Sequence, residues 1–507
     1  MATIDTAAAL WTHAGLATDS LERLELPETE PLFPTSFTVA EAAQATIGVA
    51  ALAAAELGAR RNGHRSRGNG HASPRKTTSG HTTPRNGHTT KSGHTNSVRV
   101  ERQAAERECS GLFRLDGTVP NQWAPFSGLY ATADGHVRIH ANFDHHRDGA
   151  LGLLGLDHRS AAREDVTAAL AGWRAEDFES SAAKAGLVVA AARTFEEWDT
   201  HPQALAARDL PPLRLTRIDS ADPRPWDSRA VQRQSGREGG GSQNHGTKGH
   251  TPPLSGLRVL ELTRILAGPV AGRTLATYGA DVLLLNAPYL PNIDSIVETS
   301  RGKRSALIDL KSAAGHDQMR TLVRDSDVLL QGYRPGGIAD LGFGPEAAAD
   351  VCPGIVYASL SAYGSQGPWR ERRGFDSLVQ TATGFNLAEA QAANEEAPRG
   401  LPVQILDYAS GYLLAFGIQA ALLRQLEEGG SWHVEISLLG TANWLRSLGR
   451  DPTGMRRPQP KIRDHLRSCV ATAGRLEALP HAASIGQSAL LDFAPSRMPG
   501  DDQPEWP

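Results

Sequence analysis

The sequence predicts an α/β protein built on an open, mainly parallel, Rossmann-like sheet, with a second, partial copy of the same unit at the N-terminus. Segments rich in Val and Leu, such as 257–262 and 281–285, alternate with helical segments as far as Ser359. Gly268 and Pro269 place a proline at the start of the first of these helices, and Gly279 follows its end. Alternation of this kind is typical of a parallel sheet with helices on both faces.

Length and composition narrow the class of protein. A chain of 507 residues exceeds what one hydrophobic core usually holds, so we expect two domains. The formal net charge of -4 gives no reason to expect a nucleic-acid partner. Three scattered cysteines, Cys109, Cys352 and Cys469, follow no metal or disulfide pattern, and we expect no membrane span. The expected location is the cytoplasm.

The N-terminal half is predicted as residues 1–234. It begins with a polar, loosely patterned segment, and a long Ala-rich helix is predicted from Phe37 to Arg61. Residues 62–97 are then rich in His, Gly, Arg and Thr without Leu, Ile, Val or an aromatic residue. We predict a disordered insertion there. Two short strands about the Asp134-Gly135 turn indicate a smaller α+β unit. Residues 235–252 are predicted as a flexible linker, 253–450 as the main domain and 451–507 as a C-terminal extension.

A weak internal repeat relates the two halves. The segment that begins at Gly48 parallels the segment that begins at Gly417, and in both a strand pattern follows the helix. In this alignment Thr38 takes the position of Asp407, so the N-terminal copy lacks that carboxylate.

Asp407 is a single carboxylate in apolar surroundings at the predicted start of a helix that continues to Leu422. Two interpretations are open. Asp407 caps the helix, as Asp side chains often do, or it is a nucleophile kept ionised by the helix dipole. The local sequence alone favours the cap.

Candidate binding groups lie near the predicted strand ends. Arg264, Lys303, Arg304 and Arg334 could place positive charge beside a phosphorylated ligand, because ligands of open α/β sheets bind at the carboxyl ends of strands. We interpret the group His140, Asp144, His145 and His146 as a polar helix start rather than a metal site, since no second ligand cluster accompanies it. No metal is expected.

Eight motifs in register extend over Leu254 to about Arg450. They include Thr263-Arg-Ile-Leu-Ala267-Gly268-Pro269, Gly302-Lys303-Arg304-Ser305, Gly332-Tyr333-Arg334-Pro335-Gly336, Ser361-Ala-Tyr363-Gly364, Gly374-Phe375-Asp376 and Gln404-Ile-Leu-Asp407. In order and spacing this region resembles the class III CoA-transferases, the group that also contains alpha-methylacyl-CoA racemase.

The resemblance implies a CoA-transferase acting on an acyl-CoA and a carboxylic acid acceptor, with Asp407 carrying the acyl group as a mixed anhydride and then CoA as a thioester. Coenzyme A is the implied substrate and carrier. The implied CoA-binding residues are Arg264, Ala267, Lys303, Arg304, Tyr333, Arg334 and Arg373. Family dimers interlock, so we expect an interlocked homodimer or an intrachain pseudo-dimer.

Two departures from the family pattern leave alternatives open. Asn286-Ala287-Pro288 stands where the family reads like Ile-Glu-Pro, and Asp340 stands where an arginine is common. Racemases that resemble this chain carry His-Asp where Phe375-Asp376 stands, and phenylalanine cannot move a proton. Phe375 therefore argues against a racemase, which is kept as an alternative function within the same family. The departures from the CoA-contact pattern and the missing carboxylate of the first copy leave a non-catalytic scaffold as the other alternative.

Overall fold

The computed structural model describes residues 2–68, 97–223, 251–486 and 490–507. Its centre is a seven-stranded sheet in the order β10-β9-β8-β11-β12-β13-β7. The strands are β7 (Arg214–Arg217), β8 (Arg258–Leu262), β9 (Asp281–Asn286), β10 (Arg304–Leu307), β11 (Val328–Gln331), β12 (Val356–Ser361) and β13 (Trp432–Ser437). All neighbours pair in parallel except β13 and β7. The predicted open, mainly parallel sheet is confirmed.

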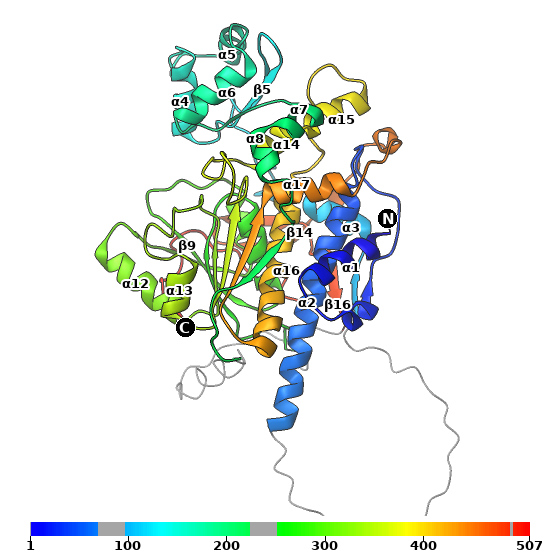
Figure 1. The fold of residues 1–507 in the computed structure, drawn as a ribbon, viewed down its shortest axis with the longest axis vertical. Helices are drawn as coiled ribbons and strands as arrows, with labels where there is room; N and C mark the ends of the chain where they lie inside the picture. The colour runs from blue at the N-terminus through cyan, green and yellow to red at the C-terminus, as the bar shows by residue number, and fades with distance from the viewer. Residues whose placement is uncertain (1, 69–96, 224–250, 487–489) are drawn as a thin grey trace, which may run out of the picture.

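Successive residues of these strands face different helices, because side chains alternate across a sheet. In β11, Val328 and Leu330 belong to the core with α10 (Ala267–Thr277), α16 (Ile405–Glu428) and α17 (Leu438–Ser447). Leu329 belongs to a second core with α12 (Ala313–Arg324) and α13 (Pro345–Val351). Figure 1 shows these two helix layers on opposite sides of the sheet.

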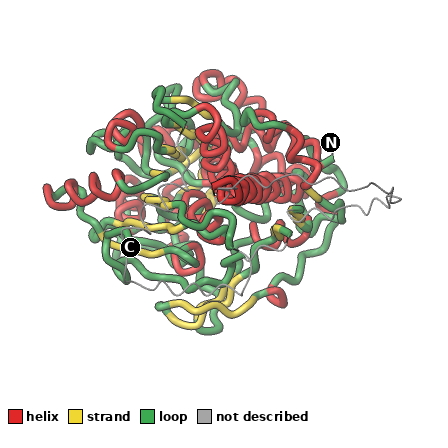
Figure 2. The backbone as a smooth tube through the Cα atoms, turned by 90° about the horizontal axis from the view of Figure 1, so that it is seen from below, coloured by secondary structure: helices red, strands yellow, loops and turns green. Residues whose placement is uncertain are grey.

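The two long helices α2 (Val39–Gly68) and α16 lie side by side near the centre of the molecule in Figure 1. Figure 2, seen from below, shows helices gathered near the middle of the molecule. The Gln419 side chain donates to the Ala50 carbonyl at 3.1 Å, and these residues are 369 positions apart. Gly48 and Gly417, which the predicted repeat aligns, have the same separation, so matching positions of the two copies meet. Helix α2 continues to Gly68, which corrects its predicted end at Arg61; residues 69–96 of the predicted insertion lie outside the described residues.

The strands that follow these two helices have different places. β13 joins the central sheet, whereas β2 (Val98–Val100) pairs with β1 (Leu24–Glu25) and β16 (Ala483–Ile485). The C-terminal extension also pairs with the N-terminal region, through β14 (Arg467–Ala471), β15 (Gly474–Ala478) and β3 (Phe113–Leu115). The remaining elements of this region are α1 (Thr3–His13), η1 (Thr18–Arg23), α3 (Arg102–Cys109), η2 (Gly454–Arg456) and η3 (Arg463–His465).

A smaller lobe stands above the central sheet in Figure 1. It contains the antiparallel strands β4 (Gly128–Ala131), β5 (His136–Ile139) and β6 (Val189–Ala191) and the helices α4 (Asp144–Leu153), α5 (Arg163–Leu170) and α6 (Ala175–Lys184). The predicted hairpin is confirmed, since β4 and β5 pair and Thr132 N–H donates to the Gly135 carbonyl at 2.9 Å. In Figure 1 the short helices α8 (Pro202–Ala206) and α14 (Asp376–Ala382) lie below the lobe, and α7 (Phe195–Thr200) and α15 (Phe385–Ala393) lie beside it. Helix α11 (Ile296–Thr299) follows β9.

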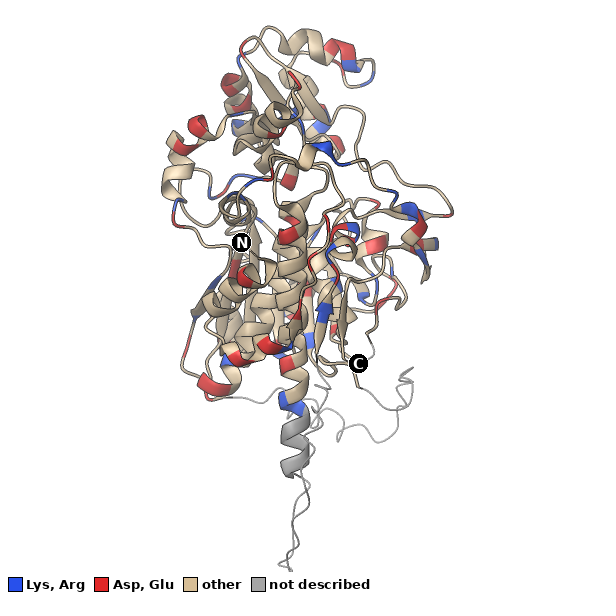
Figure 3. Cartoon of the chain, turned by 90° about the vertical axis from the view of Figure 1, so that its right-hand side faces the viewer, with Lys and Arg blue, Asp and Glu red and all other residues tan. Residues whose placement is uncertain are grey.

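Two helical stretches, Val39–Arg61 and Ile405–Glu428, are long and apolar enough to cross a membrane. Within the described residues, 89% and 100% of the apolar 18-residue windows of these stretches are buried in the protein, as in core helices. Charged residues of both signs are distributed over the rest of the described chain, as Figure 3 shows.

Candidate active site

Asp407 lies in the first turn of α16 and is 5% exposed. The position before the helix is Gln404, and no side-chain capping bond forms there. The interpretation of Asp407 as a cap is therefore wrong. The capping oxygen comes from another helix: Asp376 accepts the backbone N–H groups of Leu406 at 2.8 Å and Asp407 at 3.1 Å through one Oδ2 atom. Asp376 thus fills the role that the sequence assigned to Asp407.

Asp376 is completely buried at the start of α14, and its Oδ1 atom accepts a hydrogen bond from the Gln380 amide. Burial raises the pKa of Asp376 to about 7. Burial and the neighbouring Asp376 carboxylate raise the pKa of Asp407 well above its usual range. Two carboxylates in one dry site resist ionising together, so this pair stores electrostatic free energy, as catalytic carboxylates often do.

Asp407 lines a cavity of about 370 Å³. Predicted residues that line this cavity with it are Arg264, Ala267, Tyr333, Arg334 and Arg373. Arg372 adds a fourth guanidinium to the wall. The structure therefore brings together six of the eight residues that the sequence proposed.

Two strands of the sheet and one helix explain why these residues meet. Arg264 follows β8 and Tyr333 follows β11, and both strands end at the same edge of the sheet because they are parallel neighbours. The N-terminus of α10, at Leu266 and Ala267, opens on the same cavity. Ligand sites of open parallel sheets occupy this edge, so the cavity lies where the fold predicts it.

Arg264 and Arg373 are held in place by neighbours that are not acids. Arg264 donates to the Pro291 carbonyl, and its guanidinium lies 5.3 Å from the Phe143 ring. Arg373 donates to Nε2 of His146 at 3.3 Å. Burial and the neighbouring His145 lower the pKa of His146 to about 3, so its ring is neutral and can accept this bond. The positive charge of these arginines is left available to a ligand.

Two predicted residues lie elsewhere. Lys303 is buried and contacts Glu261 at 2.8 Å and the Pro269 carbonyl at 2.8 Å, under the helix α10. Arg304 begins β10, so it lies at the amino end of the strands, where it contacts Asp281 at 3.1 Å. The prediction that Lys303 and Arg304 contact CoA at this cavity is corrected accordingly, since neither lines it.

Ile265 has φ of 75°, in the left-handed region that β-branched residues rarely adopt. It forms the turn between β8 and α10 and lines the Asp407 cavity. Such a conformation costs about 1 to 3 kcal/mol and persists where surrounding structure imposes it, commonly at functional sites.

A second cavity of about 560 Å³ lies behind this turn. Ile265, Leu266 and Phe375 line both cavities, so they form the partition between them. The Phe375 ring stacks on His140 with centroids 4.0 Å apart. Asp376 lines the second cavity, whereas Asp407 lines the first. The two carboxylates therefore face the two sides of one partition.

The histidines of the smaller lobe serve packing and hydrogen bonding. His145 and His146 lie 4.1 Å apart between ring centroids, and His140 packs on Phe375. Within the described ranges, no three His, Cys, Asp or Glu side chains form a group that could hold a metal ion.

Sequence reasoning did not include Asp376 or Arg138, both of which line the second cavity, among the site residues. Asp376 and Gln380 are four positions apart on one helix, a spacing that brings side chains together, and this signal could have drawn attention to them. Arg138 carries no comparable local signal, because its neighbours at the cavity come from distant segments.

Comparison with known proteins identifies the region around Asp407. Residues 254–468 match the family model described as CoA-transferase family III. A protein of Mycobacterium tuberculosis, named a probable fatty acyl-CoA transferase, is 32% identical over 45% of this chain and 62% of its own length. The succinate–glutarate CoA-transferase of Agrobacterium fabrum is 32% identical over 42% of this chain and 59% of its own length.

The mouse succinyl-CoA:glutarate CoA-transferase is 30% identical over 37% of this chain and 46% of its own length. A crystal structure of the M. tuberculosis protein aligns with 34% identity and a TM-score of 0.38, over 39% of this chain and 57% of that one. The chain thus spans less than two thirds of the length of the relatives it matches.

Proposed function

We propose that this chain, whose residues 254–468 match the model of CoA-transferase family III, transfers CoA from an acyl-CoA to a carboxylic acid through covalent intermediates on Asp407. The observation that carries the proposal is one buried carboxylate on the wall of an arginine-lined cavity at the carboxyl edge of the sheet. The names of two relatives, which refer to succinate and glutarate, support a carboxylic acid as acceptor.

The four arginines of the Asp407 cavity suit the phosphates of CoA. Guanidinium groups bind phosphate through paired N–H donors, and these arginines are not neutralised by carboxylates at contact distance among the ion pairs of the described residues. Arg372 is the exception, because it lies 3.4 Å from Glu179. Arg264, Arg334 and Arg373 are therefore the proposed phosphate ligands.

The chemistry follows from the position of Asp407. Its carboxylate oxygen attacks the thioester carbonyl, the C–S bond breaks and the CoA thiolate leaves, which forms a mixed anhydride. The thiolate then attacks the aspartyl carbonyl, forms an aspartyl-CoA thioester and releases the first acid. The acceptor carboxylate attacks this thioester, and the released thiolate attacks the acyl carbon of the new anhydride. The products are the new acyl-CoA and the original Asp407 carboxylate.

Two features of the site suit the negative charges that form during these reaction steps. The N-terminus of α10 opens on the cavity, and its positive dipole end would stabilise negative charge on the thioester oxygen. Asp376 occupies the backbone N–H groups of Leu406 and Asp407, so the Asp407 side chain does not fold back to cap its own helix. It remains turned to the cavity as a nucleophile must.

The N-terminal half of the chain completes the site. Phe143, His145 and His146 of the smaller lobe line the Asp407 cavity. This arrangement supports the proposal that residues 1–234 are a partial second copy and that the chain is an intrachain pseudo-dimer with one nucleophile. Thr38, at the position that the repeat aligns with Asp407, directly precedes α2.

A racemase remains the second candidate because His140 stacks on Phe375, where related racemases carry histidine. Burial lowers the pKa of His140 to about 4, so the ring is neutral. However, His140 lines the cavity of Asp376, whereas Asp407 faces the other side of the partition. The positions therefore favour transfer over proton exchange at one carbon.

The test is to incubate the full chain with a panel of acyl-CoAs, trap with hydroxylamine and locate the adduct by mass spectrometry. The expected result is a hydroxamate on Asp407. An adduct elsewhere, or none with any acyl-CoA, would contradict the proposal. Deuterium exchange at the alpha carbon of a 2-methylacyl-CoA, measured in the same samples, would instead support the racemase.

A further inference from the structure

Two neighbouring arginines of the Asp407 cavity lie on one long loop. The loop consists of residues 362–375, between the end of β12 and the start of α14, and contains no helix or strand. Arg372 and Arg373 line the cavity near the end of this loop, and all residues from 365 to 373 are exposed or half-buried. A loop of this kind becomes ordered only where other segments hold it. The contacts that hold it therefore decide where its arginines lie.

One buried side chain of the N-terminal half fastens this loop. Gln203, on α8, is completely buried. Its amide nitrogen donates to the carbonyls of Tyr363 and Gln366, each at 3.0 Å, and its oxygen accepts the N–H of Trp369 at 2.7 Å. These bonds join positions that are 160 to 166 apart in the sequence. Gly367 lies against the same side chain, because a Cβ atom there would be 2.5 Å from the Gln203 oxygen.

The Trp369 ring connects this fastening point to Arg372. The ring centroid lies 4.5 Å from that of His201 and 4.0 Å from the guanidinium carbon of Arg372. The backbone N–H of Arg372 donates to the Trp369 carbonyl at 2.9 Å. Its side chain donates to the Val189 carbonyl at 3.1 Å and lies 3.4 Å from Glu179. Arg372 is therefore an anchor of the loop, since its charge and its aromatic contact are already engaged.

Arg373, the next residue, is held by fewer contacts. Its guanidinium donates to the His146 ring at 3.3 Å, and the ion pairs found within the described ranges do not include it. Its side chain is exposed, so its direction depends on the backbone of the loop. The two neighbouring arginines thus have different tasks, because Arg372 fixes the loop and Arg373 presents its charge to the cavity.

We propose that Gln203 and Trp369 are positioning residues, which hold residues 362–375 so that Arg373 binds a phosphate group of CoA at the Asp407 cavity. This inference rests on the proposed function, because it uses the phosphate-binding role of Arg373. A phosphate ligand that is already in place loses less conformational entropy when CoA binds, so the affinity for CoA depends on these contacts. The N-terminal half thereby contributes to CoA binding at the site of the other copy.

The first experiment measures CoA binding and needs no turnover. Isothermal titration calorimetry with CoA is carried out on the full wild-type chain, Gln203→Met, Arg373→Gln and the double variant. Each single substitution is expected to weaken binding about 10-fold or more, because a charge-assisted contact with phosphate is lost or misplaced. The double variant is expected to bind about as weakly as Arg373→Gln alone, since residues that act through one contact are not additive. Additive losses of affinity would overturn the proposal.

Gln44→Met is the matched control for the loss of a buried amide. Gln44 is also completely buried, and its amide nitrogen donates to two carbonyls, those of Pro27 at 3.0 Å and Val100 at 2.9 Å. Both Met variants should lower Tm, but only Gln203→Met should weaken CoA binding. An equal loss of affinity in Gln44→Met would show that CoA binding follows general stability, which contradicts a positioning role for Gln203.

A second pair of variants covers the case in which Gln203→Met fails to fold. Trp369 is half-buried on the loop, so Trp369→Phe and Trp369→Leu are expected to fold. Phenylalanine keeps an aromatic face for the Arg372 guanidinium, whereas leucine does not. CoA binding should therefore be weaker in Trp369→Leu than in Trp369→Phe, and the difference should disappear in the Arg373→Gln background. Equal affinities of the two variants, or a difference that persists without Arg373, would contradict the proposal.

Kinetics and adduct trapping separate this inference from the proposed function. Gln203→Met should raise the KM for the acyl-CoA and leave kcat nearly unchanged, because the phosphate contact is remote from the reacting carbonyl. The hydroxamate on Asp407 should still form at saturating acyl-CoA. A fall in kcat with an unchanged KM would refute the role of Gln203 alone. Absence of the adduct in the wild type would refute the proposed function, and the calorimetric comparison would still decide whether Gln203 acts through Arg373.

Discussion

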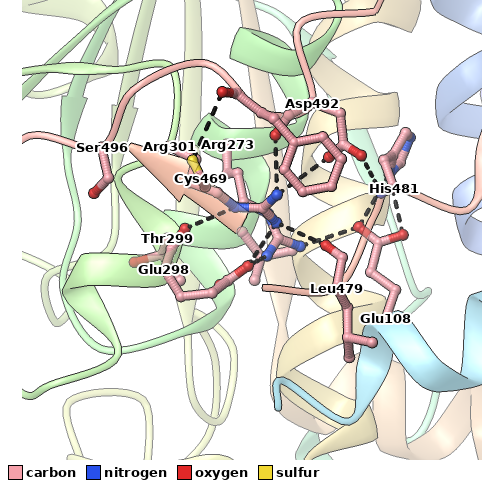
Figure 4. Close-up of polar contacts among 12 residues, drawn as sticks. Glu108, Arg273, Glu298, Thr299, Arg301, Cys469, Leu479, His481, Asp492 and Ser496 are labelled. Carbon is pink, nitrogen blue, oxygen red and sulfur yellow. Dashed lines mark hydrogen bonds and ion pairs between the residues drawn. The ribbon is translucent and has the colours of Figure 1, made fainter. Parts of the chain in front are cut away.

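Two groups among the buried acids of the described residues differ in their partners. Figure 4 shows the first, in which Arg273 contacts Glu108 at 3.2 Å and also contacts Glu298, while Arg301 contacts Glu298 at 2.7 Å. The second is Asp376 with Asp407, which contains no cation at contact distance among the described ion pairs.

The consequence appears in the pKa values. Burial acts to raise the pKa of Glu108, but His481 and Arg273 outweigh it and hold the pKa at about 2. Burial raises the pKa of Asp376 to about 7, because its hydrogen bonds do not offset the loss of water. Burial alone therefore does not identify a functional acid. The missing counter-charge distinguishes Asp407 from Glu108.

The balanced network also has a structural role that the pair lacks. Glu108 lies on α3, Arg273 on α10 and Glu298 on α11, while His481 and Asp492 belong to the C-terminal extension. The network joins three segments that are far apart in sequence. It lies beside the N-terminal part of α16, where Arg273 also donates to the Tyr412 hydroxyl at 3.3 Å. It holds the helix whose first turn carries Asp407.

The largest expected effect comes from Asp407→Asn. The amide is nearly inert as a nucleophile, so CoA transfer should fall by about 10³-fold or more, while the fold is retained. Transfer rate and thermal melting are measured on one sample. Asp340→Asn is the matched control, since Asp340 is exposed and lines neither cavity. CoA transfer that is retained in Asp407→Asn would show that Asp407 is not the nucleophile, and the proposed functional difference between the two groups of acids would be wrong.

Breaking the balanced network should affect stability rather than chemistry. Glu108→Gln leaves Arg273 with less compensation in the interior, and removing one partner of a buried pair costs about 3 to 5 kcal/mol. The folded-state pKa of Glu108 is lowered below its unfolded value, so its stabilisation exists above about pH 4.5 and is lost as pH falls toward 2. Denaturation of wild type and variant at pH 7 and pH 4 measures this difference. A difference that grows on acidification would contradict the assignment.

The carboxylate pair should show the opposite pH dependence. The folded-state pKa values of Asp376 and Asp407 are raised, so the stabilisation from their protonated forms is present at about pH 4 and is lost as pH rises through about 7. Asp407→Asn removes one ionisable group, so its free energy of unfolding at pH 8 should exceed that of the wild type, by a few kcal/mol at most. This difference should disappear near pH 4, and thermal denaturation at the two pH values measures it. A stability difference that does not change with pH would show that the two carboxylates do not repel each other in the folded protein.

The sequence predicted the sheet well because the alternation of Val and Leu with helical segments is a local signal. It also placed six of the site residues, because parallel strands bring Arg264 and Tyr333 to one edge. Lys303 and Arg304 were misplaced because Arg304 begins β10 and Lys303 directly precedes it, and residues at a strand start lie at the opposite edge. The buried Glu261 in β8 required a cation, which is the place that Lys303 takes.

Other features could not be predicted, since they depend on contacts between distant segments. Asp376 caps α16 across 30 positions, and Arg138 reaches Thr381 across 243 positions. No local sequence pattern predicts either contact. The role proposed for Asp407 could be inferred only through the family resemblance, because the residue lies where caps are common and the residue that does cap the helix is remote in sequence.

The smallest expected effect tests whether every acid in the network of Figure 4 is compensated by nearby positive charge. Asp492 accepts Arg301 at 3.2 Å and the His481 N–H at 2.7 Å, but burial raises its pKa despite the nearby Arg301. Asp492→Asn keeps one acceptor oxygen, so its cost should be about 1 kcal/mol, the net worth of one hydrogen bond. Because the folded-state pKa is raised, the wild-type carboxylate loses stability as pH rises, and the deficit of Asp492→Asn should shrink between pH 5 and pH 8. The deficit of Glu108→Gln has no such decline over that range. Denaturation of both variants at the two pH values compares them directly, and parallel behaviour would mean that Asp492 is as fully compensated as Glu108.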